Sequence, residues 1–352
     1  MILDRVKGSL VGGAIGDALG YTVEFDSYSE ILRRFGDKGI TRLYTQQDYL
    51  RPEFQVDKGV VSDDTQMTFF TAYGLLYAGK KGLMPLDGIR DAYIDWYCTQ
   101  SGAKFRSTDN WLAHIPALNV RRAPGMTCMT ALEYIYHGQC ASNNSKGCGG
   151  VMRVAPVGLW AAATGELDDE GVIRLAAQAA RITHHHPLGY IPAGVAAHLV
   201  YKLVLDEHPT REALESYVVE SMERCGAMFN HWGNEVDELN SLLSRALELA
   251  NSVEPDVDCI NRLGQGWVGD EALAIALFCA ARHFNDFERA MIAAVNHSGD
   301  SDSTGAVAGN ILGAAVGYDA LPQHFKENVE MRELAIHLAH CLNDNELRPW
   351  VL

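Results

Sequence analysis

Apolar residues recur at steps of three and four along most of the chain, which is the spacing of one face of an α-helix. The clearest stripe contains Met67, Phe70, Leu75 and Ala78, and glycines 79 and 82 then end the pattern. Comparable patterns predict helices over Asp87–Cys98, Gly171–Thr183, Ile191–Asp206, Arg211–Phe229, Asp237–Asn251, Asp270–His283 and Phe325–Leu342. Only short pieces such as Ile40–Tyr44 have the character of strands, so the sequence predicts an all-α fold.

Two further segments carry glycine at every fourth position. They are Gly8, Gly12, Gly16, Gly20 and Gly305, Gly309, Gly313, Gly317. A step of four keeps residues near one face of a helix, and glycine inside a helix costs about 1 kcal/mol relative to alanine. We therefore expect both segments to form helices at the centre of the fold, with their backbones in close contact. Arg5, Lys7 and Asp17 argue against a transmembrane role for the first segment.

No linker of biased composition divides the chain, so we predict one domain over residues 1–352. Long connections are expected at Asp26–Val60, Thr99–Met126, Gly138–Gly150 and Ser252–Gly269. Connections of this length in a helical domain often build a functional site.

The charge and the cysteine pattern exclude several classes of function. The 29 basic and 45 acidic residues give a formal net charge of −16, which disfavours binding to nucleic acid or to anionic membranes. The first residues lack the features of a signal peptide, and no uncharged apolar run is long enough to cross a bilayer. The eight cysteines form no Cys-x-x-Cys pair, so we expect reduced thiols in a cytoplasmic protein.

Two clusters of acidic and hydroxyl side chains lie at predicted helix starts, Ser62-Asp63-Asp64-Thr65 and Asp300-Ser301-Asp302-Ser303-Thr304. Serine and aspartate are favoured helix caps, so capping explains part of each cluster. A helix needs only one cap, however, and four carboxylates brought together repel unless they bind protons or cations. Because two divalent ions would balance four carboxylates, we expect a two-metal site if the clusters meet.

Two other acidic residues are candidates for the same site. Glu24 follows the first glycine segment and is either a solvated loop residue or a member of the site. Asp17 lies in an otherwise apolar helix, so we expect it to be buried and hydrogen-bonded. Such a residue would orient a metal ligand or a helix terminus rather than react.

The glycine-rich segment Asn144–Arg153 could present backbone N–H groups to phosphates, although it lacks the Walker pattern and also suits an ordinary turn. The tract from His184 to His186 looks like a metal-binding sequence. Oxygen ligands elsewhere make this unnecessary, and a helix C-terminus followed by Pro187 is the simpler interpretation. We therefore favour a pocket-wall role for His184.

Several motifs follow one another along essentially the whole chain. They are Gly16-Asp17-Ala18-Leu19-Gly20 with Val23-Glu24-Phe25, Ser62-Asp63-Asp64-Thr65-Gln66-Met67, Gly147-Cys148-Gly149-Gly150-Val151-Met152-Arg153, Thr183-His184-x-His186-Pro187, Gly266-Trp267-Val268-x-Asp270-Glu271-Ala272-Leu273 and Gly299-Asp300-x-Asp302-Ser303-x-Gly305-Ala306. In this order, the motifs resemble the ADP-ribosylglycohydrolase family, the family of the dinitrogen-reductase-activating glycohydrolase.

The resemblance implies an all-α domain with a dinuclear magnesium centre, manganese being the alternative metal. By position, the metal ligands would be Ser62, Asp63, Asp64, Asp300, Asp302 and Ser303. Glu24 matches an acidic residue on a mobile loop that approaches the metals in some members. The residues expected near ADP-ribose are Gly147, Cys148, Gly149, Gly150, Met152, His184, Trp267 and Gly269, the last replacing the alanine usual in the family.

The function implied is a hydrolase that releases ADP-ribose from a modified protein side chain, with arginine as the first expectation. The metals would bind the two vicinal ribose hydroxyls, and Glu24 or Asp63 would act as acid or base. The partners would be an ADP-ribosylated protein or ADP-ribosyl-arginine, with ADP-ribose as the product and its diphosphate on the N–H groups of the glycine loop. Serine-linked and small-molecule conjugates stay open.

Two other functions remain at this point. A two-metal phosphohydrolase would release phosphate from simple esters. A non-catalytic relative would bind ADP-ribose without turnover. The six intact ligating groups favour an enzyme, because a site that has lost its activity need not keep them.

Overall fold

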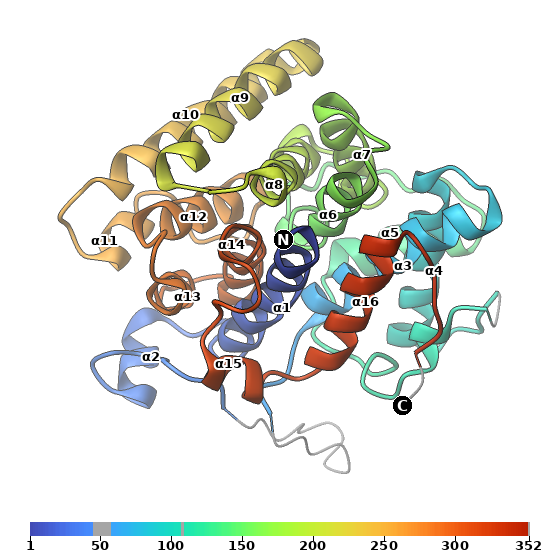
Figure 1. Ribbon diagram of the computed structural model, residues 1–352, viewed down its shortest axis with the longest axis horizontal. Coiled ribbons are helices and arrows are strands. Elements are labelled where there is room, and N and C mark those ends of the chain that lie inside the picture. Colours follow the sequence, from blue (N-terminus) through green and yellow to red (C-terminus); the bar gives the residue numbers. More distant parts are fainter. Residues whose placement is uncertain (45–57, 107–108, 351–352) are drawn as a thin grey trace.

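The computed structural model describes residues 1–44, 58–106 and 109–350 (Figure 1). The described residues contain sixteen α-helices and no strand beyond two isolated backbone bridges, which confirms the all-α prediction. The helices are α1 (Ile2–Tyr21), α2 (Tyr28–Phe35), α3 (Asp63–Lys81), α4 (Pro85–Ser101), α5 (Met126–Tyr136), α6 (Ala155–Thr164), α7 (Asp169–Arg181), α8 (Pro187–Leu205), α9 (Arg211–Met228), α10 (Gly233–Ala250), α11 (Asp256–Ile260), α12 (Gly269–Arg282), α13 (Phe287–Val295), α14 (Ser301–Val316), α15 (Gln323–Asn328) and α16 (Arg332–Asp344).

The two glycine-striped helices, α1 and α14, lie side by side at the centre (Figure 1). They run antiparallel with glycine facing glycine, so that a Cβ atom added to Gly16 would lie 1.9 Å from the Gly305 carbonyl oxygen. A Cβ atom added to Gly309 would lie 2.1 Å from the Gly12 carbonyl oxygen. The expected backbone contact is therefore present, and no residue larger than glycine fits at these positions.

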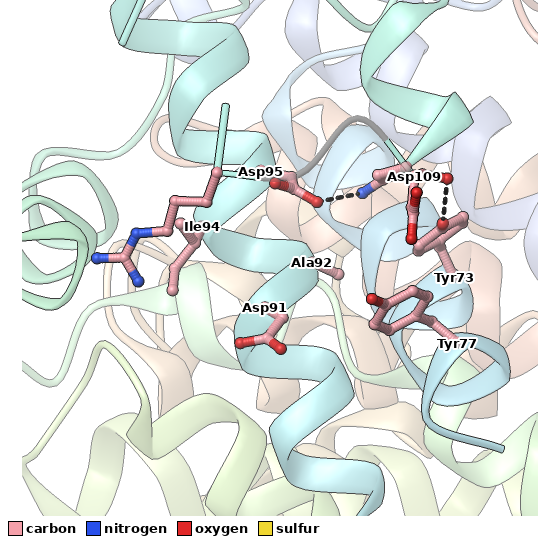
Figure 2. Close-up of a pocket in the computed structure, with 9 residues that line it drawn as sticks. Tyr73, Tyr77, Asp91, Ala92, Ile94, Asp95 and Asp109 are labelled. Carbon is pink, nitrogen blue, oxygen red and sulfur yellow. Dashed lines mark hydrogen bonds between the residues drawn. The ribbon is translucent and has the colours of Figure 1, made fainter. Parts of the chain in front are cut away.

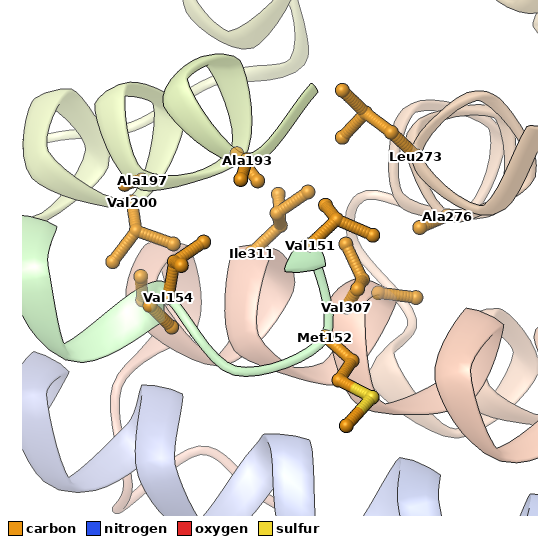
Figure 3. Close-up of a cluster of buried hydrophobic side chains, with 14 of the residues drawn as sticks. Val151, Met152, Val154, Ala193, Ala197, Val200, Leu273, Ala276, Val307 and Ile311 are labelled. Atoms are coloured by element: carbon orange, nitrogen blue, oxygen red, sulfur yellow. The ribbon is translucent and has the colours of Figure 1, made fainter. Parts of the chain in front are cut away.

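A continuous hydrophobic core surrounds this pair and extends from Val6 in α1 to Leu342 in α16. One part of it lies between α8, α12 and α14, where Val151 and Met152 insert from the segment after the glycine loop (Figure 3). Burial of Met152 among apolar side chains fixes the path of that segment, which leads to the candidate site.

Several shorter helices are absent from the sequence prediction, for different reasons. The ten residues of α6 are mostly buried on all sides, so they show no alternation of apolar and polar faces. Helix α2 lies inside a predicted loop and begins at Ser27, whose side chain accepts a hydrogen bond from the Glu30 N–H. Helix α13 was also not predicted.

The predicted strand at Ile40–Tyr44 is wrong, because this segment is irregular. The side-chain amide of Asn296 satisfies the Ile40 backbone instead. Its Oδ1 accepts from the Ile40 N–H at 2.8 Å, and its Nδ2 donates to the Ile40 carbonyl at 2.8 Å. A distant side chain has thus replaced the neighbouring strand that the local pattern suggested.

The single helix predicted at Phe325–Leu342 is also wrong, since it is divided into α15 and α16. Between them, Met331 has a φ of 59°, which ends the helical path. The intervening residues pair instead with Gly59. Its N–H donates to the Asn328 carbonyl at 2.8 Å, and its carbonyl accepts from the Glu330 N–H at 3.0 Å.

Among the helices of the described residues, α8 is the one that is long and apolar enough to cross a membrane. In the structure, 83% of that stretch is buried inside the protein. The core helix of a compact fold passes the same test, and the burial of α8 is that of a core helix.

Replacing Gly309 by alanine should destabilise the protein by roughly 3 kcal/mol, because the methyl group would collide with the backbone of α1. The matched control is Gly79→Ala in α3, where nothing lies within 4 Å of the added Cβ atom. This control should gain about 0.5–1 kcal/mol from helix propensity. Chemical denaturation measures both, and equal stability of the two variants would contradict the backbone contact.

Candidate active site

The first acidic cluster begins α3, and Asp17 of α1 holds it there. The Asp17 carboxylate accepts from the Ser62 N–H at 2.9 and 3.1 Å and from the Thr65 N–H at 3.0 Å. Asp17 is fully buried and hydrogen-bonded, as the sequence predicted. Its pKa is raised to about 6 by burial, against the effect of these hydrogen bonds. Because Asp17 takes over part of the capping, the side chains of Asp63 and Asp64 are available for other work.

The second acidic cluster begins α14. Asp300 is the N-cap, and its Oδ1 accepts from the Ser303 N–H at 3.3 Å. The preceding Gly299 has a φ of 143°, and a Cβ atom there would lie 2.0 Å from the Gln265 carbonyl oxygen. Only glycine suits this position. The close backbone approach that it allows places Asp300 beside the segment that leads into α12.

The two clusters meet in one site. Ser303 lies close enough to Asp64, and Asp302 close enough to Glu24, to shift the pKa of the neighbouring carboxyl group. Glu24 reaches this position because α1 ends next to the start of α14, where a Cβ atom added to Gly20 would lie 2.2 Å from the Ser301 carbonyl oxygen. The predicted metal ligands and Glu24 are therefore neighbours.

The site concentrates buried negative groups. Asp63, Asp64, Asp300 and Asp302 are each between 2% and 4% exposed. None of them forms an ion pair with lysine, arginine or histidine within the part of the chain that the structure describes. Four carboxyl groups in this state must carry protons or bind cations.

The pKa values follow from this environment. Burial, with Asp17 and Asp300 nearby, raises the pKa of Asp63 to about 8. Burial also raises the pKa values of Asp64 and Asp302 well above the usual range. The pKa of Glu24 is raised to about 8, first by burial and then by Asp300 and Asp63. At neutral pH these groups therefore hold protons, and a divalent cation that binds to them would displace those protons.

The donor set fits hard divalent cations. Oδ2 of Asp64 is buried and has no hydrogen-bond partner among the described residues, which is a costly state unless a cation takes that place. Ser62 and Ser303 add hydroxyl oxygens, although the Ser62 Oγ also accepts from the Asp64 N–H at 3.2 Å. Carboxylate and hydroxyl oxygens are the ligands that Mg²⁺ and Mn²⁺ prefer.

The predicted glycine loop lies next to the second cluster and is paired with the start of α12. The Cys148 N–H donates to the Trp267 carbonyl at 3.2 Å, and the Gly269 N–H donates to the Lys146 carbonyl at 2.8 Å. The Gly147 N–H donates to the Ser145 hydroxyl at 3.2 Å. The N–H groups of Gly147 and Cys148 therefore already have partners within the protein, and the binding of a diphosphate by the loop stays a prediction.

His184 and Met152 lie behind the loop. His184 is 2% exposed, and a Cβ atom added to Gly149 would lie 2.9 Å from its ring. Its pKa is lowered to about 3, chiefly by burial and then by Arg153. The neutral ring therefore packs against the loop from the protein interior. Met152 is also buried, with its Sδ 4.0 Å from the Ser303 Oγ.

Phe25 and Gly125 were not among the predicted site residues, and the contact of Cys148 with Asp300 was not predicted. Phe25 is 73% exposed and stacks on Trp267, with ring centroids 5.4 Å apart. The Cys148 thiol, predicted only as a loop member, donates to Asp300 Oδ2 at 2.8 Å. The Gly125 N–H donates to Asp63 Oδ2 at 3.2 Å. No sequence signal distinguishes these partners, since all of these contacts join distant segments.

Two other polar groupings lie outside this site. Asp169, His198 and Glu220 have ligand atoms within 4.8 Å of one another, as a metal site requires. Lys202 pairs with both carboxylates of that group at 3.5 and 3.1 Å, and so does Arg224 at 3.2 and 2.7 Å. Protein cations thus already balance its charge.

A cavity of about 280 Å³ lies between α3 and α4 (Figure 2). It is lined by tyrosine and aspartate side chains, and its Asp95 accepts from Asn110 at 2.9 Å. It contains none of the residues predicted for the acidic site. We therefore take the meeting point of the two acidic clusters as the candidate active site.

The sequence profile of the ADP-ribosylglycohydrolase family matches residues 1–348. The chain belongs to the ADP-ribosylglycohydrolase family. It is 26% identical over 333 residues to the ADP-ribosyl-[dinitrogen reductase] glycohydrolase of Rhodospirillum rubrum, which covers 94% of this chain and 91% of that protein. It is 28% identical over 228 residues to the ADP-ribosylhydrolase ARH3 of Mus musculus, covering 59% of this chain and 60% of that protein.

A solved structure titled ADP-ribosylglycohydrolase-related protein complex has the same fold. Its chain superposes with a TM-score of 0.62 at 24% identity, covering 98% of this chain and 99% of that one. The family and fold predictions are thus confirmed, and this ADP-ribosylglycohydrolase is an enzyme of a metal-dependent family.

The metal-free ADP-ribosylglycohydrolase should lose thermal stability as the pH rises from 6.5 to 8. Glu24 and Asp63 have folded-state pKa values of about 8, whereas unfolded carboxyls ionise near pH 4. In this window the folded state binds more protons than the unfolded state, so raising the pH favours unfolding. We expect a fall in Tm of about 2 °C per pH unit, measured by calorimetry in EDTA.

The Asp63→Asn variant should show a smaller slope, because it removes one of these titrating groups. The control is Asp237→Asn, which changes an exposed carboxylate in α10. A Tm that is constant between pH 6.5 and 8 in the unaltered protein would contradict the raised pKa values.

Proposed function

We propose that this ADP-ribosylglycohydrolase cleaves the N-glycosidic bond between ADP-ribose and an arginine side chain of a modified protein. The observation that carries the proposal is the convergence of Asp63, Asp64, Asp300 and Asp302 with Glu24 in one buried site. We also propose that residues 1–352 act as one domain in the cytoplasm, without nucleic-acid or membrane partners.

Two Mg²⁺ ions, with Mn²⁺ as the alternative, would be held by the six residues predicted from the sequence. These are Ser62, Asp63, Asp64, Asp300, Asp302 and Ser303. The unpartnered Asp64 oxygen and the absence of protein cations around the described carboxylates support this assignment. When bound, such ions fix and polarise the vicinal hydroxyls of the ribose.

We assign the acid role to Glu24 and the base role to Asp63. Glu24, with a pKa of about 8, holds a proton at neutral pH and can give it to the departing guanidine nitrogen. The carbon–nitrogen bond breaks as water attacks the anomeric carbon. Asp63, which bound cations would keep in its ionised form, accepts the proton of that water. The Gly125 N–H fixes one oxygen of Asp63 for this task.

The aromatic pair beside Glu24 supports arginine as the leaving group. Phe25 directly follows Glu24 and stacks on Trp267, which is itself 37% exposed. A carboxylate next to an aromatic face is a common arrangement for binding a planar guanidinium group. The adenosine diphosphate part of the substrate would then extend along Gly147, Cys148 and Gly269.

Similarity to named relatives agrees with this substrate class without fixing the linkage. The relative whose name specifies ADP-ribosyl-[dinitrogen reductase] matches over 94% of this chain. The similarity to ADP-ribosylhydrolase ARH3 is confined to 59% of it. Serine-linked and small-molecule conjugates are the alternatives. The following measurement separates the serine linkage from the arginine linkage.

The unaltered protein should release ADP-ribose from an arginine-modified protein with Mg²⁺, and EDTA should abolish the release. Asp302→Ala should lower the rate by at least about 100-fold, because it removes a carboxylate from the metal centre. A parallel assay uses a serine-modified peptide. Faster release from serine would move the function to O-linked conjugates, and metal-dependent ADP-ribose binding without any release would indicate a non-catalytic relative.

Substitutions at Glu24 and Trp267 should separate catalysis from binding. Glu24→Gln should lower kcat by about 10²–10⁴-fold with little change in KM, because only proton transfer is lost. Trp267→Ala should chiefly raise KM for the arginine conjugate, because it removes one aromatic face. Glu30→Gln, in the neighbouring helix α2, is the control. Unchanged kcat in Glu24→Gln would contradict the acid role.

A further inference from the structure

A buried ion pair between Arg122 and Glu330 lies behind the first acidic cluster. The guanidinium Nη2 is 3.1 Å from Glu330 Oε1, and Nη1 is 3.3 Å from Oε2. The two side chains are 6% and 7% exposed, and no other ion pair of the described residues is buried on both sides to this degree. Burying such a pair carries a desolvation cost, which favours a specific role over simple stabilisation.

Both members of the pair hold the backbone that enters the cluster. The Arg122 Nη1 donates to the Val61 carbonyl at 3.2 Å, and Glu330 Oε2 accepts from the Val61 N–H at 3.2 Å. The Arg122 carbonyl also accepts from the Asp63 N–H at 3.0 Å. Asp17 meanwhile accepts from the Ser62 N–H. Three consecutive residues thus have their backbone fixed from outside the cluster.

Each member of the pair is itself tied to a separate part of the fold. The Arg122 N–H donates to the Gln100 side chain at the end of α4 at 3.2 Å. The Glu330 N–H donates to the Gly59 carbonyl at the break between α15 and α16. The chain from Arg122 also leads to Gly125, whose N–H donates to the Asp63 carboxylate. The contacts therefore connect α3, α4 and the C-terminal helices at one point.

We infer that Arg122 and Glu330 are positioning residues for the metal centre. By fixing Val61 to Asp63, the pair sets where the oxygens of Ser62, Asp63 and Asp64 lie relative to the α14 cluster. Neither residue would touch the substrate or the ions. The inference rests on the proposed metal centre and adds to it two residues that belong to none of its ligand motifs.

The test measures Mn²⁺ affinity by calorimetry in the absence of substrate. Arg122→Gln and Glu330→Gln should each weaken Mn²⁺ binding by about 10–100-fold, as is usual when residues that orient metal ligands are lost. Arg122→Lys should recover little of this, because an ammonium group cannot make the two-point contact with Glu330. The control for lost stability is Leu239→Ala, a core truncation in α10 that should leave the affinity unchanged.

An apolar replacement of the pair separates positioning from stability. Arg122→Met combined with Glu330→Leu removes the buried charges together, so this variant should fold better than either single variant. It should still bind Mn²⁺ weakly, because the Val61 backbone has lost both contacts. Wild-type affinity in any folded variant lacking the pair would overturn the inference. Absence of Mn²⁺ binding by the unaltered protein would instead contradict the metal centre itself.

Discussion

The close backbone contact between α1 and α14 is the constraint on which the site depends. Glycine faces glycine along both helices, so the two helix axes approach more closely than side chains would allow. The antiparallel arrangement places the end of α1 beside the beginning of α14. Glu24 therefore lies next to Asp302, and Asp17 lies where it can cap α3. Without this contact the residues of the site would not be held close to one another.

The second organising feature is the accumulation of buried negative charge without protein cations. Asp63, Asp64 and Asp302 are almost fully buried, and burial raises their pKa values. Such an arrangement is unfavourable for folding alone, because each ionised carboxylate loses its hydration. Glu330, a carboxylate of comparable burial outside this site, is by contrast paired with Arg122. The contrast supports the proposal that this site binds cations.

The surroundings of the site explain how an acidic protein can act on an anionic nucleotide. The formal net charge of −16 would repel ADP-ribose at long range. Two bound divalent ions would neutralise the four carboxylates locally, so metal binding would favour substrate binding as well as chemistry. Part of the backbone of the glycine loop is paired with the Trp267–Gly269 segment. Its role is then to shape the wall beside Asp300.

The sequence by itself determined the features that depend on local periodicity and residue type. The helical class, the two glycine stripes and the acidic clusters at helix starts follow from spacing and capping preference, and the structure contains all of them. The division of the predicted helix at 325–342 and the irregular segment at 40–44 were decided by distant partners, Gly59 and Asn296. The partners of Asp64, the Phe25–Trp267 stack and the Arg122–Glu330 pair also arise only in the folded chain. The physical reason is that hydrogen bonds and ring contacts between remote segments leave no periodic trace in the sequence, whereas the burial of one helix face does.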